Sequence, residues 1–108
     1  MTTNIQSLHF DADRKLLDFV NEKVNKLTVF YDGFISSDVI LRLDKSSNSE
    51  NKVAEIILHT KGQDLFSKKQ SASFEESIDL VCEALKTQIK KYKEKVQETN
   101  LGVSELPE

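Results

Sequence analysis

Apolar residues in the last third of the chain recur at the spacing of a helix. They lie three or four positions apart, which places them on one helix face, and they are Phe74, Ile78, Cys82, Leu85, Ile89, Tyr92 and Val96. Ser73 and Glu76 have the spacing of a capping box, in which a hydroxyl accepts a hydrogen bond from the backbone N–H three residues on. The pattern therefore predicts a long helix over residues 73–98, packed through one face.

A second stripe of the same kind predicts a helix nearer the N-terminus. Its apolar positions also lie three or four residues apart, at Leu16, Val20, Val24, Leu27 and Tyr31. Asp11 or Asp13 can cap its start, and Gly33 suits the left-handed conformation that often ends a helix. We therefore expect a helix that runs from this cap to about Tyr31.

Four segments are predicted to be strands, over residues 1–10, 35–43, 53–60 and 65–70. The alternation is clearest in the middle two, whose core-facing residues are Val39, Leu41 and Leu43 in one and Ala54, Ile56 and Leu58 in the other. A polar loop over residues 44–51 joins these two strands. Gly62 marks a tight turn before the last strand, and we expect it to supply a positive φ there.

The resulting order of elements is β-α-β-β-β-α. This order predicts an α+β fold, with two helices packed on one face of a four-stranded, mainly antiparallel sheet. The pattern alone leaves the place of the first strand open. We expect one domain over residues 1–98. Residues 99–108 contain Asn100, Gly102 and Pro107 and no apolar periodicity, so we expect them to form a disordered acidic tail.

Length, charge and cysteine content narrow the function classes. The 108 residues suit a single core, and a formal net charge of −3 is not that of a generally basic nucleic-acid binder. No apolar run reaches the roughly 18 residues that cross a bilayer, and the N-terminus lacks the apolar stretch of a signal peptide. One cysteine cannot form an internal disulfide. We expect a reduced, soluble, cytoplasmic protein.

Candidate catalytic groups are few. His9 and His59 lack acidic neighbours at a metal-ligand spacing, and we interpret both as residues on strand surfaces. Cys82 lies in the apolar stripe, which favours core filling over a nucleophilic role. The glycines are isolated, so the chain has no phosphate-binding loop. We therefore predict no enzyme, no metal site, no cofactor and no small-molecule substrate.

Positive charge is concentrated in the second half of the last predicted helix. Its cations are Lys86, Lys90, Lys91, Lys93 and Lys95. Helix geometry places Lys91 and Lys95 on one flank of the apolar stripe and the other three lysines on the opposite flank. The segment therefore combines an anchored apolar face with a cationic end.

Two interpretations of these lysines remain open. Cations near a helix C-terminus complement the helix dipole, and solvated lysine faces are common. Alternatively, the lysines join Lys23 and Lys26 of the first helix in a basic ridge. Such a ridge would hold the phosphates of folded RNA, with salt-dependent affinity and little base readout.

Two groups of residues carry a resemblance to a known family. In the last predicted helix they are Ile78, Asp79, Leu85, Gln88, Lys91 and Lys95. Near the N-terminus they are Asn4, Ile5, Phe19, Val20, Lys26, Leu27, Phe30 and Tyr31. In this order, residues 1 to about 97 resemble the ribosome hibernation-promoting and ribosome-associated inhibitor proteins, a family also called sigma-54 modulation proteins.

The resemblance implies a fold akin to double-stranded RNA-binding domains and a translation inhibitor that acts on ribosomes. Its partners would be the small ribosomal subunit, its 16S rRNA near the decoding region, and the 70S ribosome. Occupying that region would block messenger and transfer RNA in stationary phase or stress. By position, Lys23, Lys26, Lys91 and Lys95 match basic residues of the family, and Lys90 is an additional cation. With Lys86, these residues form the expected RNA-binding set.

Some positions depart from the family pattern. Val29, Ala84 and Thr87 stand where some members have basic side chains, and Glu75 replaces a frequent aromatic residue. Fewer matched cations imply weaker or differently oriented phosphate contacts, which Lys86, Lys90 and Lys93 could offset. The resemblance is to the short form of the family, so we expect no long-form dimerisation domain.

Two other functions compete with RNA binding. The first is a protein-interaction module that modulates a transcription regulator, as the sigma-54 label suggests, in which case the lysines only solubilise the helix. The second and weaker is a thiol enzyme that uses Cys82, which requires the thiol to be exposed beside a base.

Overall fold

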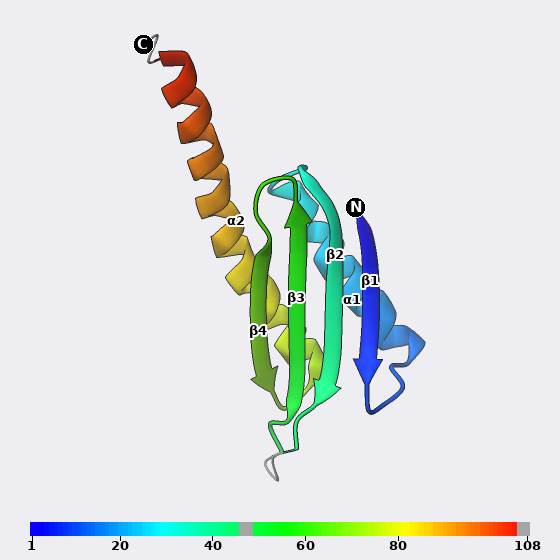
Figure 1. Ribbon diagram of the computed structural model, residues 1–108. Helices are drawn as coiled ribbons and strands as arrows, with labels where there is room; N and C mark the ends of the chain where they lie inside the picture. The colour runs from blue at the N-terminus through cyan, green and yellow to red at the C-terminus, as the bar shows by residue number, and fades with distance from the viewer. Residues whose placement is uncertain (46–48, 106–108) are drawn as a thin grey trace.

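The computed structural model describes residues 1–45 and 49–105, with 96–105 described by their backbone alone. Its elements are β1 (Thr2–Leu8), α1 (Arg14–Lys26), a short 3-10 helix η1 (Leu27–Val29), β2 (Phe34–Leu43), β3 (Lys52–Thr60), β4 (Leu65–Ser71) and α2 (Phe74–Glu105). Figure 1 shows the strands in one sheet with both helices behind it. The predicted α+β fold and its element order are confirmed.

The strands follow the order β1-β2-β3-β4 across the sheet. β1 pairs in parallel with β2, so that Ile5 lies opposite Val39, and the other two pairs are antiparallel. Two parallel neighbours need a crossover connection, which α1 supplies. The mainly antiparallel sheet is therefore confirmed, and β1 lies at its edge beside β2.

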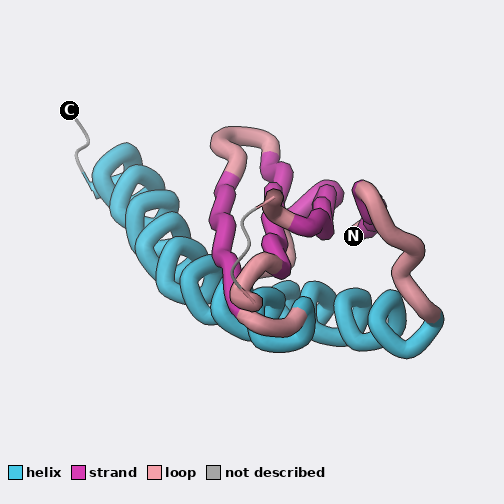
Figure 2. Tube along the Cα trace, turned by 90° about the horizontal axis from the view of Figure 1, so that it is seen from below, coloured by secondary structure: helices cyan, strands magenta, loops and turns pink. Residues whose placement is uncertain are grey.

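The core fills the space between the sheet and the helices. The fully buried side chains of this apolar cluster come from both layers and are Val20, Val24, Val39, Leu41, Ala54, Ile56, Leu58, Ile78, Val81, Leu85 and Ile89. Burying one such aliphatic side chain larger than alanine contributes about 1.5–3 kcal/mol. Figure 2 shows that both helices lie on the same side of the sheet and that α2 projects beyond it. The core therefore anchors the first half of α2 and leaves its lysine-rich end beside and beyond the sheet.

Helix starts are set by the side chains that the sequence indicated. Asp13 Oδ1 accepts a hydrogen bond of 2.8 Å from the backbone N–H of Leu16, so Asp13 and not Asp11 caps α1. Ser73 Oγ accepts one of 3.1 Å from the backbone N–H of Glu76, which confirms the predicted cap of α2. These bonds satisfy N–H groups that have no partner inside the first turn of a helix.

Both predicted glycine conformations are wrong. Neither Gly33 nor Gly62 has a positive φ; among the described non-glycine residues, His9 has one, at 72°. Gly33 follows η1, and the Tyr31 ring occupies the space where a Cβ on Gly33 would lie, 2.4 Å away. Gly33 is therefore needed for the close approach of an aromatic ring, and the turn at Gly62 is held by a side chain described below.

The last helix is longer than its apolar pattern indicated. The helical backbone continues past the predicted end at Glu98 to Glu105. Thr, Asn and Gly each cost an established helix about 1 kcal/mol or less, whereas proline disfavours the helical conformation of the residue before it. Pro107 is thus the first strong stop signal. Residues 106–108 lie outside the described part, and the division into a 1–98 domain and an acidic tail stays a prediction.

Over the residues that the structure describes, neither helix combines the length and apolar character required to span a bilayer. The 32 residues of α2 are long enough, but lysines and acids interrupt them throughout.

Candidate nucleic-acid interface

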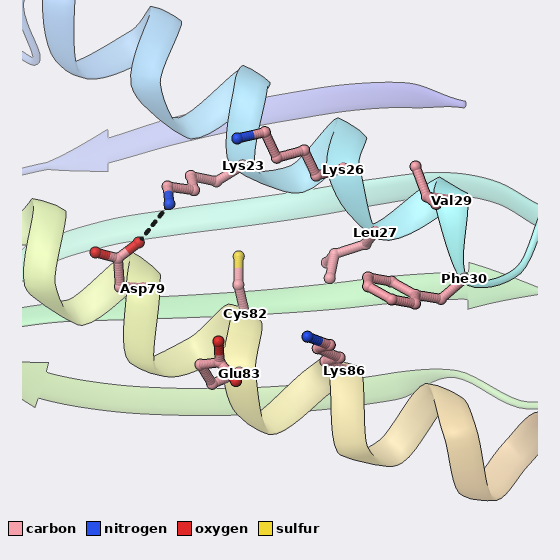
Figure 3. A pocket seen from close by; sticks show the side chains of 9 residues that line it. All are labelled: Lys23, Lys26, Leu27, Val29, Phe30, Asp79, Cys82, Glu83 and Lys86. Atoms are coloured by element: carbon pink, nitrogen blue, oxygen red, sulfur yellow. Dashed lines mark ion pairs between the residues drawn. The ribbon is translucent and has the colours of Figure 1, made fainter.

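A groove between the two helices, here called the interhelix groove, collects three lysines. It encloses about 620 Å³ and is lined by Lys23, Lys26, Leu27, Val29, Phe30, Asp79, Cys82, Glu83 and Lys86. Figure 3 shows α1 and η1 supplying one wall and α2 the other. The groove exists because α1 and α2 pack side by side on the sheet, as a shared ridge requires.

Two lysines of this groove already contact an acidic or aromatic side chain. Lys23 Nζ lies 3.0 Å from Asp79 Oδ1, and this hydrogen bond and charge raise the pKa of Lys23. Lys86 Nζ lies 5.1 Å from the centre of the Phe30 ring, a cation–π distance. With Asp79 and Glu83 among its lining residues, the groove carries three cations against two carboxylates. Its positive charge is therefore largely compensated.

A second, smaller groove lies on the opposite flank of α2, beside the turn between β3 and β4. This turn-side groove encloses about 200 Å³ and is lined by Gln63, Leu65, Gln88, Lys91, Tyr92 and Lys95. Two cations and no carboxylate stand among these six residues. Gln88 Nε2 donates a 2.8 Å hydrogen bond to the carbonyl oxygen of Phe66, which ties this flank of α2 to the edge strand β4.

Five of the six predicted RNA-binding lysines line one of the two grooves. Lys23, Lys26 and Lys86 line the interhelix groove, whereas Lys91 and Lys95 line the turn-side groove. Lys90 is exposed on α2 and lines neither. Lys93, which is not in the predicted set, lines a third hollow together with residues 28–32. Lys86 therefore lies on the α1 side of α2 and Lys91 and Lys95 on the side of the β3–β4 turn, as their helical spacing indicated.

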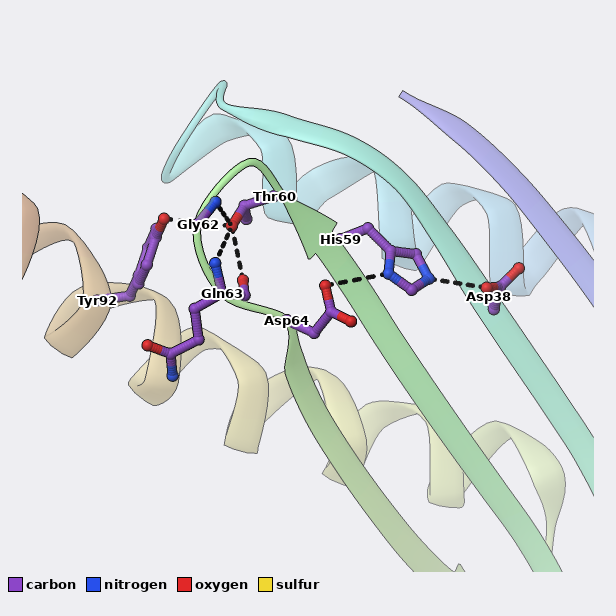
Figure 4. Close-up of polar contacts among 7 residues, drawn as sticks. All are labelled: Asp38, His59, Thr60, Gly62, Gln63, Asp64 and Tyr92. Carbon is purple, nitrogen blue, oxygen red and sulfur yellow. Dashed lines mark hydrogen bonds and ion pairs between the residues drawn. The ribbon is translucent and has the colours of Figure 1, made fainter.

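The turn beside the second groove is built around Thr60. Its hydroxyl donates to the carbonyl oxygen of Gln63 at 2.6 Å and accepts from the backbone N–H groups of Gly62 and Gln63, at 3.2 and 2.9 Å. The Thr60 and Tyr92 hydroxyls are 3.2 Å apart. Figure 4 shows this network joining the turn to α2. The hydroxyl of Thr60 therefore holds this turn together, whereas the sequence pattern indicated that a positive φ at Gly62 would do so.

His59 has the acidic partners that its sequence neighbourhood did not show. Its Nε2 lies 2.8 Å from Asp38 Oδ2, and its Nδ1 lies 3.1 Å from Asp64 Oδ1 (Figure 4). Hydrogen bonds to Asp38 and Asp64 raise the pKa of His59, and the bond to His59 lowers the pKa of Asp38. Asp38 comes from the neighbouring strand β2, so strand pairing was needed to find this cluster.

The comparison with known proteins decides the family. Residues 3–97 match the family model described as Sigma 54 modulation protein / S30EA ribosomal protein. The chain belongs to this family.

Relatives of this S30EA family member are named ribosome hibernation promoting factors. One from Azotobacter vinelandii is 29% identical over 94% of this chain and 92% of its own length. Another, from Pseudomonas putida, is 28% identical over 96% of this chain and 98% of its own length. A Bacillus subtilis relative named ribosome hibernation promotion factor is 30% identical over 89% of this chain, which corresponds to 50% of that protein.

Solved structures share the fold. A ribosomal subunit interface protein from Coxiella burnetii superposes with a TM-score of 0.77 at 19% identity, covering 86% of this chain and 98% of that one. The N-terminal domain of Thermus thermophilus Protein Y gives 0.74 at 22% identity, covering 85% and 99%. At these identities the agreement is one of fold.

The thiol of Cys82 is poorly suited to nucleophilic chemistry in this structure. Cys82 is half-buried between the helices, and burial together with the charge of Asp79 raises its pKa to about 11. A thiol with that pKa is almost entirely protonated near neutral pH, so it is a poor nucleophile. Among the described residues, no group of three or more His, Cys, Asp or Glu side chains is arranged to hold a metal ion.

Proposed function

We propose that this S30EA protein is a ribosome hibernation factor that binds 16S rRNA of the small subunit near the decoding region. There it would block access of messenger and transfer RNA in stationary phase or stress. The family match over residues 3–97 carries this proposal, and the names of the relatives support it. Its location would be the cytoplasm, where ribosomes are.

The charge distribution favours the lysine-rich end of α2 as the main RNA contact. The turn-side groove presents Lys91 and Lys95 without a lining carboxylate, and Lys90 and Lys93 are exposed nearby. Lys23 pairs with Asp79 and Lys26 with Glu22, so binding a phosphate at either lysine requires competition with a carboxylate. We infer that the turn-side groove, which has no carboxylate among its lining residues, contributes more to affinity than the interhelix groove.

Co-sedimentation with purified 70S ribosomes tests the proposal and this ranking. The variants Lys23→Glu/Lys26→Glu and Lys91→Glu/Lys95→Glu change the net charge equally. The variant Lys45→Glu/Lys68→Glu makes the same change at two exposed residues outside both grooves and serves as the matched control. We expect the control to sediment like the wild type, the Lys91/Lys95 variant to lose most binding, and the Lys23/Lys26 variant to lose less. Equal binding by all three variants would remove both grooves from the interface.

Modulation of a transcription regulator remains the alternative, favoured by the other half of the family description. The sheet face opposite the helices offers a surface for a protein partner, with Phe66 47% exposed on the edge strand. Pull-down from nuclease-treated lysate discriminates the two functions. Retention of a non-ribosomal protein partner without rRNA, together with no co-sedimentation with ribosomes, would support the alternative.

A further inference from the structure

Both ring nitrogens of His59 face carboxylate oxygens, at 2.8 Å for Asp38 and 3.1 Å for Asp64. A carboxylate can only accept a hydrogen bond, and a neutral imidazole has one N–H to donate. Both contacts can be hydrogen bonds only when the ring is the doubly protonated imidazolium. The geometry therefore selects the charged form of His59, and loss of one proton must break one of the two bonds.

The two carboxylates belong to different parts of the fold. Asp38 lies on β2 and also accepts a 3.4 Å hydrogen bond from Asn4 on β1. Asp64 lies in the turn between β3 and β4. The sheet neighbour paired with His59 on β2 is the uncharged Ser36, and Lys61 is an exposed cation two residues farther along the chain. Protonated His59 thus links Asp64 in the turn to Asp38 on the central strand β2.

The fastened turn is also one wall of the turn-side groove. Gln63 and Leu65, the residues on either side of Asp64, both line that groove together with Lys91 and Lys95. On the other side of the turn, Thr60 bonds to Gln63 and contacts the Tyr92 hydroxyl of α2. The turn is therefore held at two points, by the pH-insensitive hydroxyl of Thr60 and by the titratable ring of His59.

We propose that protonated His59 is a positioning residue for the RNA-binding site, because it holds the turn that walls the Lys91–Lys95 groove and so makes RNA affinity pH-dependent. The inference rests on the proposed function and adds its regulation. When the pH rises and the ring loses a proton, the Asp38 or Asp64 contact breaks and Gln63 loses its fixed position. The hydrogen bonds raise the pKa of His59, so affinity is highest below that value and falls as the pH rises through it.

The two histidines of the chain provide a matched pair of variants. His9→Gln removes the exposed histidine of the β1–α1 connection and leaves His59 as the single imidazole. His9→Gln/His59→Gln removes both. Circular dichroism at each pH verifies that both variants are folded, and the full-length chain is used throughout.

Two measurements on this pair test the inference. In ring NMR spectra of His9→Gln, we expect both nitrogens to be protonated at pH 6.5 and the midpoint to exceed the ordinary value of about 6.5. Affinity for 70S ribosomes at constant ionic strength should fall about threefold to tenfold from pH 6 to pH 9, the range that corresponds to the net loss of one hydrogen bond. The double variant should show a flat profile.

The outcomes separate this inference from the proposed function. Parallel affinity profiles for the two variants, or a ring midpoint at or below about 6.5, would overturn the positioning role while ribosome binding stands. Absence of ribosome binding at every pH would overturn the proposed function and the inference with it.

Discussion

Replacing Thr60 by valine should destabilise the protein measurably, because it removes the hydroxyl that closes the β3–β4 turn. Valine has nearly the same shape but cannot exchange hydrogen bonds. The hydroxyl makes three bonds to Gly62 and Gln63, of 2.6 to 3.2 Å, and contacts Tyr92. Leaving buried partners unsatisfied costs about 1–3 kcal/mol. Gly62 and Gln63 are exposed, so water replaces part of the loss and we expect about 1–2 kcal/mol.

Urea unfolding followed by far-UV circular dichroism measures this change. The midpoint should fall while the slope with denaturant stays constant, because the surface exposed on unfolding is nearly unchanged. Thr60→Ser retains the hydroxyl and should lose clearly less stability than Thr60→Val. Tyr92→Phe removes only the contact to α2 and should cost less than Thr60→Val. A Thr60→Val stability within about 0.3 kcal/mol of wild type, below the usual net value of one hydrogen bond, would refute the role given to the hydroxyl.

Three further predictions follow from other contacts. Gly33→Ala should lower the free energy of unfolding, measured in urea, by about 1–3 kcal/mol. The added Cβ would clash with the Tyr31 ring, which packs against Phe34 and Tyr92; an unchanged midpoint would contradict this. Thiol labelling of folded protein at pH 8 should be at least about a hundredfold slower than in urea, because the pKa of Cys82 is about 11; equal rates would contradict that pKa. The stability difference between wild type and His59→Gln should be largest between about pH 4 and 6.5. The raised pKa of His59 and the lowered pKa of Asp38 make that contribution decline above and below this window; a difference that is constant with pH would exclude the ion pair as its source.

The sequence was most informative where one local pattern decides the structure. Alternation placed Val39 and Leu41 on the core face because side chains of a strand point to opposite sides in turn. Helical spacing separated Lys91 and Lys95 from Lys86 for the same kind of reason. The Ser73 cap was also predictable, because the hydroxyl and the N–H that it binds are only three residues apart.

The parts that the sequence missed depend on contacts between distant segments. His59 meets Asp38 only because β2 and β3 pair in one particular register, which a single sequence does not reveal. Gly33 and Gly62 were assigned a backbone conformation from residue type, whereas the packing of Tyr31 and the hydroxyl of Thr60 determine those turns. The two grooves could not be predicted from the sequence either, because they form only when α1 and β4 pack against α2.

Co-sedimentation with 70S ribosomes across a salt series tests the central claim most directly. Binding through lysine–phosphate contacts predicts that log affinity falls linearly with log salt, with a slope of roughly −0.7 to −0.9 for each phosphate neutralised. We predict a steep slope for the wild type and a shallower one for Lys91→Glu/Lys95→Glu. Failure to sediment with ribosomes at low salt, or affinity that does not change with salt, would contradict the account.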